Sequence, residues 1–504
     1  MARPSRIQRA DAVFLAALAI GLLILWRTAF IESHWDEDAG MAIGWLLSKG
    51  WRLYSDVFSH HMPLDYIPSW AISCLFGPSQ ALCRAFMIGG WALLCCGLWR
   101  LEKTPAILFT LLSSLWLTYW MGQMLLVENL WAGFAVLLLA LASSPAAKIK
   151  AAGAGALLGA LLCSSLTCGP VFLLLLFEFL RQPGWRKFFR QFAAGFAGWM
   201  FVFLAWSWSH ADLGLWYTDA VRFNNFSYAF FSGLKPGEAG GGLMLQALAK
   251  NIGYFASTLS WNNLEQYFEG ILRLAWLGWI AWTAAQKRWR EAAWWAALAL
   301  ALRLRVEHFL YTPPFHGAPF FLAGTWLLSR ALVLVWDGLR ARAKTMAWAW
   351  AWAWAWAAAC AVLLAATLVP TALATASLSA YDRDGGGDSA IVDAIKKATG
   401  PEDAIAVLPM YPKLYIESGR VPATPSVFYL PWQAAWPEQH ERTLAALRDC
   451  SPKIVVIYDT KIWGVPWSEY GADIEAWLRE NYRSVGNFKD AQLWVRRDRL
   501  TLSQ

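Results

Sequence analysis

Apolar segments of about 20 residues, each long enough to cross a lipid bilayer, recur along the chain from Asp11 to about Thr371. Short hydrophilic breaks separate these segments. Beyond this point the pattern changes to short apolar runs that alternate with polar helical ones. The pattern predicts a polytopic α-helical membrane protein that carries a soluble α/β domain at its C-terminal end.

The apolar segments define about eleven spans. They lie near residues 11–30, 83–100, 105–121, 124–143, 151–167, 169–180, 188–209, 267–286, 291–307, 315–336 and 346–370. Lys and Arg gather in alternate breaks, which by the positive-inside rule face the cytoplasm. We therefore expect a cytoplasmic N-terminus and a periplasmic or extracellular C-terminal domain, in the inner (plasma) membrane. For the two sides to alternate in this way, residues 63–79, which contain three prolines, must lie along the outer face without crossing the membrane.

The expected organisation is a transmembrane domain over residues 1–380, with outward loops 31–82 and 210–266, and an α/β domain over residues 381–504. Within the second domain we predict helices over 388–399, 436–450 and 468–482 and strands over 404–408, 453–458 and 491–496. It contains no glycine-rich phosphate loop and no recognisable catalytic triad. Acceptor recognition and structural capping are both open roles for it.

Composition agrees with a membrane protein. The chain has 504 residues, is 58% hydrophobic and contains 35 Trp, and its mean hydropathy is +0.37, which water-soluble globular proteins do not reach. The net charge of +8 arises from basic residues in the breaks between spans, so it indicates membrane topology and not nucleic-acid binding. Most of the eight Cys lie in or beside apolar segments, and their spacing predicts neither a disulfide framework nor a zinc knuckle.

An acidic stretch follows the first span, although the whole chain is only 15% charged. It carries Glu32, Asp36, Glu37, Asp38, Asp56 and Asp65, together with His34, His60 and His61. Apolar side chains between Trp45 and Tyr54 recur at helical intervals, which favours short amphipathic helices in the membrane interface that hold the carboxylates over the mouth of a cavity. The alternative is a solvated loop whose carboxylates merely avoid the bilayer.

Further ionisable groups fall on the same predicted side of the membrane. Glu128 lies at the outward end of the fourth span and Arg84 begins the second. Arg303, Arg305, Glu307 and His308 lie at the outward end of the ninth span, at spacings that let Arg303 meet Glu307 and Arg305 meet His308 on a helix. Charged groups at membrane depth are costly and often functional. The alternative is that they are snorkelling or mutually neutralised helix ends.

Carboxylates and cations at one membrane face suit the transfer of a sugar from a polyprenyl phosphate. This reaction needs a base for the proton of an acceptor hydroxyl and cations for the departing phosphate. Phosphate is a weakly basic leaving group, so no second carboxylic acid is required to protonate it. One carboxylate is enough for the proton transfer.

An ordered series of motifs makes the chain resemble a known family. The series comprises Trp35-Asp36-Glu37, Gly50-Trp51 with Leu53, Tyr54 and Asp56, the run His60 to Tyr66, Leu75 to Gly77, Arg84, and Glu128-Asn129. In this order the motifs resemble the GT-C glycosyltransferases, and most closely the branch of bacterial lipid A aminoarabinose transferases and protein O-mannosyltransferases. The resemblance covers about the first 140 residues, and again residues 308–324 faintly.

The resemblance implies roles for these residues. Asp36, the first acid of the Asp-Glu pair, would be the base, with Glu37 beside it; Glu128 and Asp56 would orient the acceptor and the site. The lipid phosphate would be held by basic residues of the outward loops, namely His60, His61, Arg84, Arg303, Arg305 and His308. Family members often have a Lys and two prolines where this chain has His61, Met62 and Pro63, so the phosphate contact is expected to differ here.

The function expected from this resemblance is inverting sugar transfer at the outer face of the membrane, from a polyprenyl-phosphate-linked sugar to an acceptor glycan, lipid or protein. No cofactor is required, although Asp36 and Glu128 are groups that can bind a divalent cation. A transporter or flippase of lipid-linked sugars is one alternative, but the internal repeats and broken helices typical of transporters are not found. A non-catalytic envelope assembly protein on the same scaffold is another.

Overall fold

The computed structural model describes residues 6–29, 34–119, 121–143, 148–232, 249, 264–303, 314–343, 386–462, 464–488 and 491–498. The chain divides into two compact units, each assembled from three separate stretches. Unit 1 contains Met1–Ile31, Arg84–Phe203 and Gly241–Leu378. Unit 2 contains Glu32–Cys83, Leu204–Gly240 and Ser379–Gln504.

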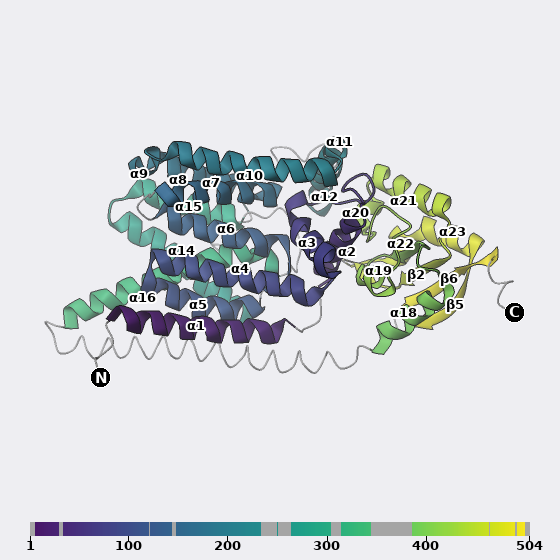
Figure 1. The fold of residues 1–504 in the computed structure, drawn as a ribbon, viewed down its shortest axis with the longest axis horizontal. Helices are drawn as coiled ribbons and strands as arrows, with labels where there is room; N and C mark the ends of the chain where they lie inside the picture. The colour runs from purple at the N-terminus through teal and green to yellow at the C-terminus, as the bar shows by residue number, and fades with distance from the viewer. Residues whose placement is uncertain are drawn as a thin grey trace. The chain divides into compact units, whose positions relative to one another are not determined.

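Unit 1 is a bundle of helices (Figure 1). They are α1 (Arg6–Thr28), α4 (Gln80–Leu101), α5 (Lys103–Tyr119), α6 (Val127–Ala142), α7 (Lys148–Ser164), α8 (Gly169–Arg181), the short α9 (Pro183–Arg186), α10 (Phe189–His210), α14 (Leu264–Ala285), α15 (Trp289–Arg303) and α16 (Ala318–Ala343), with 3₁₀ turns η2 (Leu166–Cys168) and η4 (Pro314–Gly317). Every predicted span except 346–370, which lies outside the described residues, coincides with one of these helices.

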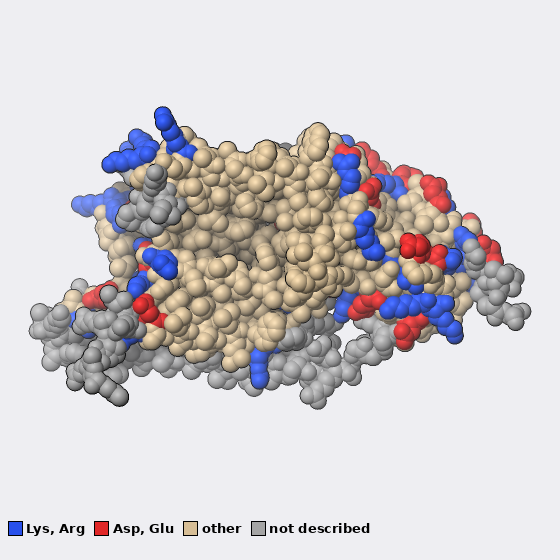
Figure 2. Space-filling view, in the orientation of Figure 1, with Lys and Arg blue, Asp and Glu red and all other residues tan. Residues whose placement is uncertain are grey.

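The surface of unit 1 is that of a protein surrounded by lipid. Large apolar side chains such as Leu93 and Phe201 are each 74% exposed, whereas Trp116, Trp276 and Trp326 are fully buried. Arg9–Arg27, α4, α10 and Ala318–Ala341 are long and apolar enough to cross a membrane. In Figure 2 the visible face of this bundle is almost bare of charged side chains between its ends, and Lys and Arg gather at the end that carries α9. These features, which the sequence predicted, define a multi-pass membrane protein.

Unit 2 combines the acidic stretch with the C-terminal domain. Its helices are α2 (Trp35–Ser48), α3 (Ile67–Phe76), α11 (Leu213–Trp216), α12 (Phe223–Ser232), α18 (Gly386–Ala398), α19 (Lys413–Ser418), α20 (Pro431–Ala434), α21 (Pro437–Cys450), α22 (Trp467–Tyr470) and α23 (Ala472–Asn481), with the 3₁₀ turn η1 (Pro63–Tyr66) and the π-helical turn η3 (Tyr217–Arg222). Its strands are β1 (Ile405–Leu408), β2 (Ile454–Tyr458), β3 (Lys461–Ile462), β4 (Val465–Pro466), β5 (Tyr482–Phe488) and β6 (Ala491–Arg496).

The main sheet has the order β1-β2-β6-β5, in which β1 and β2 are parallel and the other pairs antiparallel. Strands β1 and β2 are buried along their whole length, as their continuous apolar sequences predict. The helix expected over 468–482 is divided at Gly471 into α22 and α23. Strand β5 was not predicted, because it is a sheet edge whose side chains are mostly exposed and lack an apolar alternation.

Helix α2 is present where helical spacing was predicted, but it is not an amphipathic helix with one solvent-exposed face. Its residues from Glu37 to Leu47 are buried apart from Gly40, and Leu46 and Leu47 belong to the same core as Leu414 and Tyr415 of α19. A helix that is apolar on all sides is favourable only when it is enclosed. The amphipathic surface that we expected for this helix is therefore wrong for most of its residues, whereas its place at the membrane interface stays a prediction.

Helix α3 is only ten residues long, and so rises about 15 Å, half the thickness of a hydrocarbon core of about 30 Å. It packs closely on α2, where Ser69 Oγ donates to the Gly40 carbonyl over 2.9 Å. At Gly44 a Cβ atom would lie 2.2 Å from Ser69 Oγ and 2.7 Å from its carbonyl carbon. The approach of the two helices thus depends on the absence of a side chain at Gly44.

We expect Gly44→Ala to destabilise unit 2 by about 1–3 kcal/mol, because the added methyl group meets backbone that must shift. The matched control is Gly40→Ala on the same helix, where a Cβ meets nothing within 4 Å and alanine is the better helix former by up to about 1 kcal/mol. Melting temperatures of the two variants in lipid nanodiscs measure the difference. Equal melting temperatures would contradict the close helix contact.

Candidate functional site

The predicted catalytic pair lies in the first turn of α2. His34 caps this helix, and its Nδ1 accepts from the Asp36 amide over 3.3 Å. Asp36, Glu37 and Asp38 follow at the helix N-terminus, where the helix dipole stabilises negative charge. The Asp36 side chain is 23% exposed and lies 3.3 Å from His34 Nδ1. Asp36 is therefore held in place and still open to a substrate.

Glu37 differs from its neighbour in being fully buried. Its side chain has 0% exposure, and its Oε2 accepts from Gln80 Nε2 over 3.1 Å. A buried carboxylate with polar partners can position neighbouring groups but cannot receive a proton directly from a substrate in solution. Of the predicted pair, Asp36 is therefore the accessible carboxylate and Glu37 the enclosed one.

The loop that carries His60 and His61 is held by hydrogen bonds to its backbone. Tyr54 Oη donates to the His61 carbonyl over 2.8 Å, and Asn224 Nδ2 donates to the His60 carbonyl over 2.7 Å. Ser59 Oγ and Tyr66 Oη lie 2.7 Å apart. The two imidazole rings are adjacent, with centroids 4.1 Å apart. This loop is thus a fixed element of unit 2.

The two histidines differ in their ability to carry charge. Burial lowers the pKa of His60 well below its usual value, and the neighbouring His61 adds to this effect. His60 is therefore neutral near pH 7. The side chain of His61 is 35% exposed and its Nδ1 lies 3.7 Å from Asp65 Oδ2. Of these two residues, His61 is the more accessible one and has a carboxylate beside it.

Asp56 forms an exposed turn and does not point into the core of unit 2. Its Oδ2 accepts from the Arg52 amide over 2.8 Å. The same turn is held from the C-terminal domain by Arg442 of α21, which donates to the carbonyls of Tyr54 and Ser55. Arg442 also lies 3.4 Å from Asp219 of η3. Burial raises the pKa of Asp219 to about 6, and Arg442 acts against this rise.

Unit 1 holds the remaining predicted residues. Glu128 is the second residue of α6, and its Oε1 lies 3.0 Å from His316 Nδ1 in η4. The next residue, Asn129, fixes the turn before α6 by donating to the carbonyls of Met121 and Met124 over 2.8 and 3.2 Å. His316 was not among the predicted residues. The only signal in the sequence was its place, just before a predicted span on the same side as Glu128.

The predicted arginines lie at different depths in unit 1. Arg84 of α4 is fully buried, and its Nη1 donates to the Ala29 carbonyl over 3.0 Å. Arg303 is partly buried in the last turn of α15. Arg305, Glu307 and His308 lie outside the described residues. Within the described ranges, no three or more His, Cys, Asp or Glu side chains gather in a way that could hold a metal ion.

The apolar helix bundle joined to a small sheet domain is the fold of the GT-C glycosyltransferases. The chain is similar to the crystal structure of ArnT from Cupriavidus metallidurans in the apo state, with a TM-score of 0.54 and 16% identity over 96% of this chain and 98% of that one. It is equally similar to ArnT bound to undecaprenyl phosphate, with a TM-score of 0.53 and 16% identity over 97% and 98% of the two chains. No family model and no curated protein matches by sequence. At this identity the likeness establishes the fold.

Proposed function

We propose that this protein is an inverting glycosyltransferase that moves a sugar from a polyprenyl-phosphate donor to an acceptor hydroxyl at the outer face of the membrane. The observation that carries the proposal is Asp36. It is a partly exposed carboxylate at a helix N-terminus, in a chain that shares the GT-C fold with ArnT over 96% of its length. One such base is enough, because a phosphate leaving group does not need a second carboxylic acid to protonate it.

The reaction needs a single displacement. Asp36 takes the proton of the acceptor hydroxyl while the acceptor oxygen forms a bond to the anomeric carbon of the sugar. The bond between that carbon and the phosphate oxygen breaks, its electron pair stays with the phosphate, and the polyprenyl phosphate leaves. Attack opposite to the leaving group inverts the anomeric centre. His34 caps the helix that carries Asp36 and so helps to hold the base in position.

The departing phosphate needs positive charge or hydrogen-bond donors. In unit 2 the partly exposed His61 fits this role better than His60, which burial keeps neutral. In unit 1 the partly buried Arg303 is a better candidate cation than Arg84, which is fully buried, and the Glu128–His316 pair is a candidate orienting element. A polyprenyl phosphate donor is supported by the ArnT structure that binds undecaprenyl phosphate.

The test is reconstitution of the purified protein in liposomes with polyprenyl-phosphate-linked sugars extracted from bacterial membranes, together with envelope glycans and glycolipids as acceptors. Mass spectrometry should show free polyprenyl phosphate and a new glycoside in equal amounts. Movement of the lipid-linked sugar between leaflets without a new glycoside would indicate a flippase instead. If neither occurs, and envelope glycans from cells with and without the protein are identical, the enzymatic function is refuted.

A further inference from the structure

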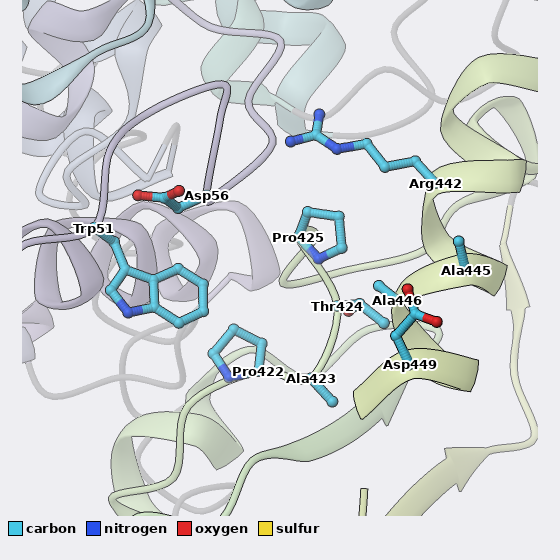
Figure 3. A pocket seen from close by; sticks show the side chains of 10 residues that line it. All are labelled: Trp51, Asp56, Pro422, Ala423, Thr424, Pro425, Arg442, Ala445, Ala446 and Asp449. Carbon is cyan, nitrogen blue, oxygen red and sulfur yellow. The ribbon is translucent and has the colours of Figure 1, made fainter. Parts of the chain in front are cut away.

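Unit 2 contains an open pocket of about 400 Å³, within the range of small-molecule sites. It is lined by Trp51, Asp56, Pro422, Ala423, Thr424, Pro425, Arg442, Ala445, Ala446 and Asp449. Figure 3 shows the indole of Trp51 and the carboxylate of Asp56 on one side, the chain from Pro422 to Pro425 in the middle, and Asp449 on α21 opposite. One wall therefore comes from the acidic stretch and the other from the C-terminal domain.

The pocket walls are fixed before any ligand binds. The Phe58 amide donates to the Pro425 carbonyl over 2.6 Å, which ties the acidic stretch to the middle wall. Arg442 ties the same stretch to α21 through the carbonyls of Tyr54 and Ser55. Pro422 is bridged to Ile405 of β1. A preformed pocket loses little conformational entropy on binding, so it is suited to recognition.

The polar groups of the pocket are predominantly acceptors of hydrogen bonds. Asp56 uses one oxygen for the Arg52 amide, and Asp449 is exposed and accepts no hydrogen bond from the described part of the chain. The guanidinium of Arg442 is already engaged by two carbonyls and by Asp219. An anionic ligand would therefore be repelled by two carboxylates. A ligand that donates hydrogen bonds from its rim and offers an apolar face to Trp51 is favoured.

Sugar rings have this combination of a C–H face and a rim of hydroxyl groups. We infer that the pocket is a subsite for the carbohydrate part of the acceptor, in which a sugar ring lies on Trp51 and its hydroxyls donate to Asp56 and Asp449. The assignment to the acceptor rests on the proposed function, because an enzyme of that kind must hold an acceptor, and an acceptor glycan or glycolipid offers a sugar ring. The binding of sugar itself does not depend on catalysis.

The experiment measures saturation-transfer NMR from the full-length protein in lipid nanodiscs to maltose and to chitobiose. Maltoside detergents must be absent, because their headgroups are ligands of the proposed class. We expect transfer to at least one disaccharide. Asp449→Asn should weaken this binding about tenfold, since it removes a charged acceptor, and Ala445→Phe should abolish it by filling the pocket. The matched control is Glu441→Gln, which removes one carboxylate from an exposed position of the same helix that does not line the pocket.

The absence of transfer to both disaccharides from the wild-type protein would overturn the inference. Equal binding by Asp449→Asn and Glu441→Gln would overturn it as well, because the sugar would then bind elsewhere. No donor lipid is present, so the result is independent of activity. Sugar binding without any sugar transfer in the liposome assay would refute the proposed function and leave the pocket as a carbohydrate site.

Discussion

Replacing Asp36 with asparagine should lower the rate of sugar transfer by about 10²–10⁴-fold, the usual contribution of a general base. Asparagine has nearly the same shape, but it cannot accept the proton of the acceptor hydroxyl. The protein should remain folded and inserted, because the 23% exposed side chain contributes little to the core. The measurement is formation of the glycoside by the protein in liposomes, at equal amounts of inserted protein.

The matched control is Asp459→Asn, which neutralises an exposed carboxylate in the loop after β2. This variant should transfer sugar at the wild-type rate. Melting temperatures of both variants distinguish a loss of chemistry from a loss of folding. Wild-type activity in Asp36→Asn would remove Asp36 as the base and leave the proposed mechanism without its proton acceptor.

Replacing Arg442 with methionine should destabilise unit 2 by about 3 kcal/mol at pH 7.5. The substitution keeps an apolar stem but leaves Asp219 as a buried carboxylate without its cation, and removing one partner of a buried pair typically costs about 3–5 kcal/mol. The Arg442 side chain is 29% exposed, so we expect the loss of stability to lie at the lower end of this range. Melting temperature in nanodiscs and hydrogen exchange of the peptide containing residues 51–58 report the change.

The loss of stability in the Arg442→Met variant should be larger at high pH than at low pH. The pKa of Asp219 in the folded protein is about 6, above its ordinary value of 3.8. Protonated Asp219 therefore favours the folded state. Its contribution to the free energy of unfolding is complete below about pH 4 and is lost as the pH rises through about 6. Without Arg442 the pKa of Asp219 rises further, so the loss of stability should be smaller at pH 5, where mainly the hydrogen bonds to the Tyr54 and Ser55 carbonyls are missing. Adding Asp219→Asn should restore the part of the stability at pH 7.5 that is due to the unpaired carboxylate. An equal loss at both pH values would contradict this account.

The sequence predicted the fold because membrane spans and buried strands have strong local signals. A helix such as α4 is predominantly apolar and long enough to span, and Ile454–Tyr458 is an unbroken buried strand. The predicted helix 468–482 is divided at Gly471. A Cβ atom at this position would lie 2.5 Å from the ring of Trp467. Trp467 lies only four positions before Gly471, so the contact is local, but helical periodicity does not report the direction in which the ring points.

Partners in the candidate sites were less predictable than the elements. Asp36 and Glu37 are adjacent in the sequence, yet nothing there shows that one is partly exposed and the other buried. His316 meets Glu128 from a segment almost 190 positions away, and Arg442 reaches Tyr54 across 388 positions. Pairings of this length arise from topology. Local composition marks such residues as charged but does not identify the groups that they meet.

The assembly of unit 2 from three distant stretches sets an order of events during synthesis. Asp36 and its helix leave the ribosome long before Arg442 is made, because chains grow from the N-terminus. The turn at Tyr54 and Ser55 receives the hydrogen bonds of Arg442 only after α21 has been translated. The contacts between α21 and the acidic stretch are therefore among the late ones to form during synthesis.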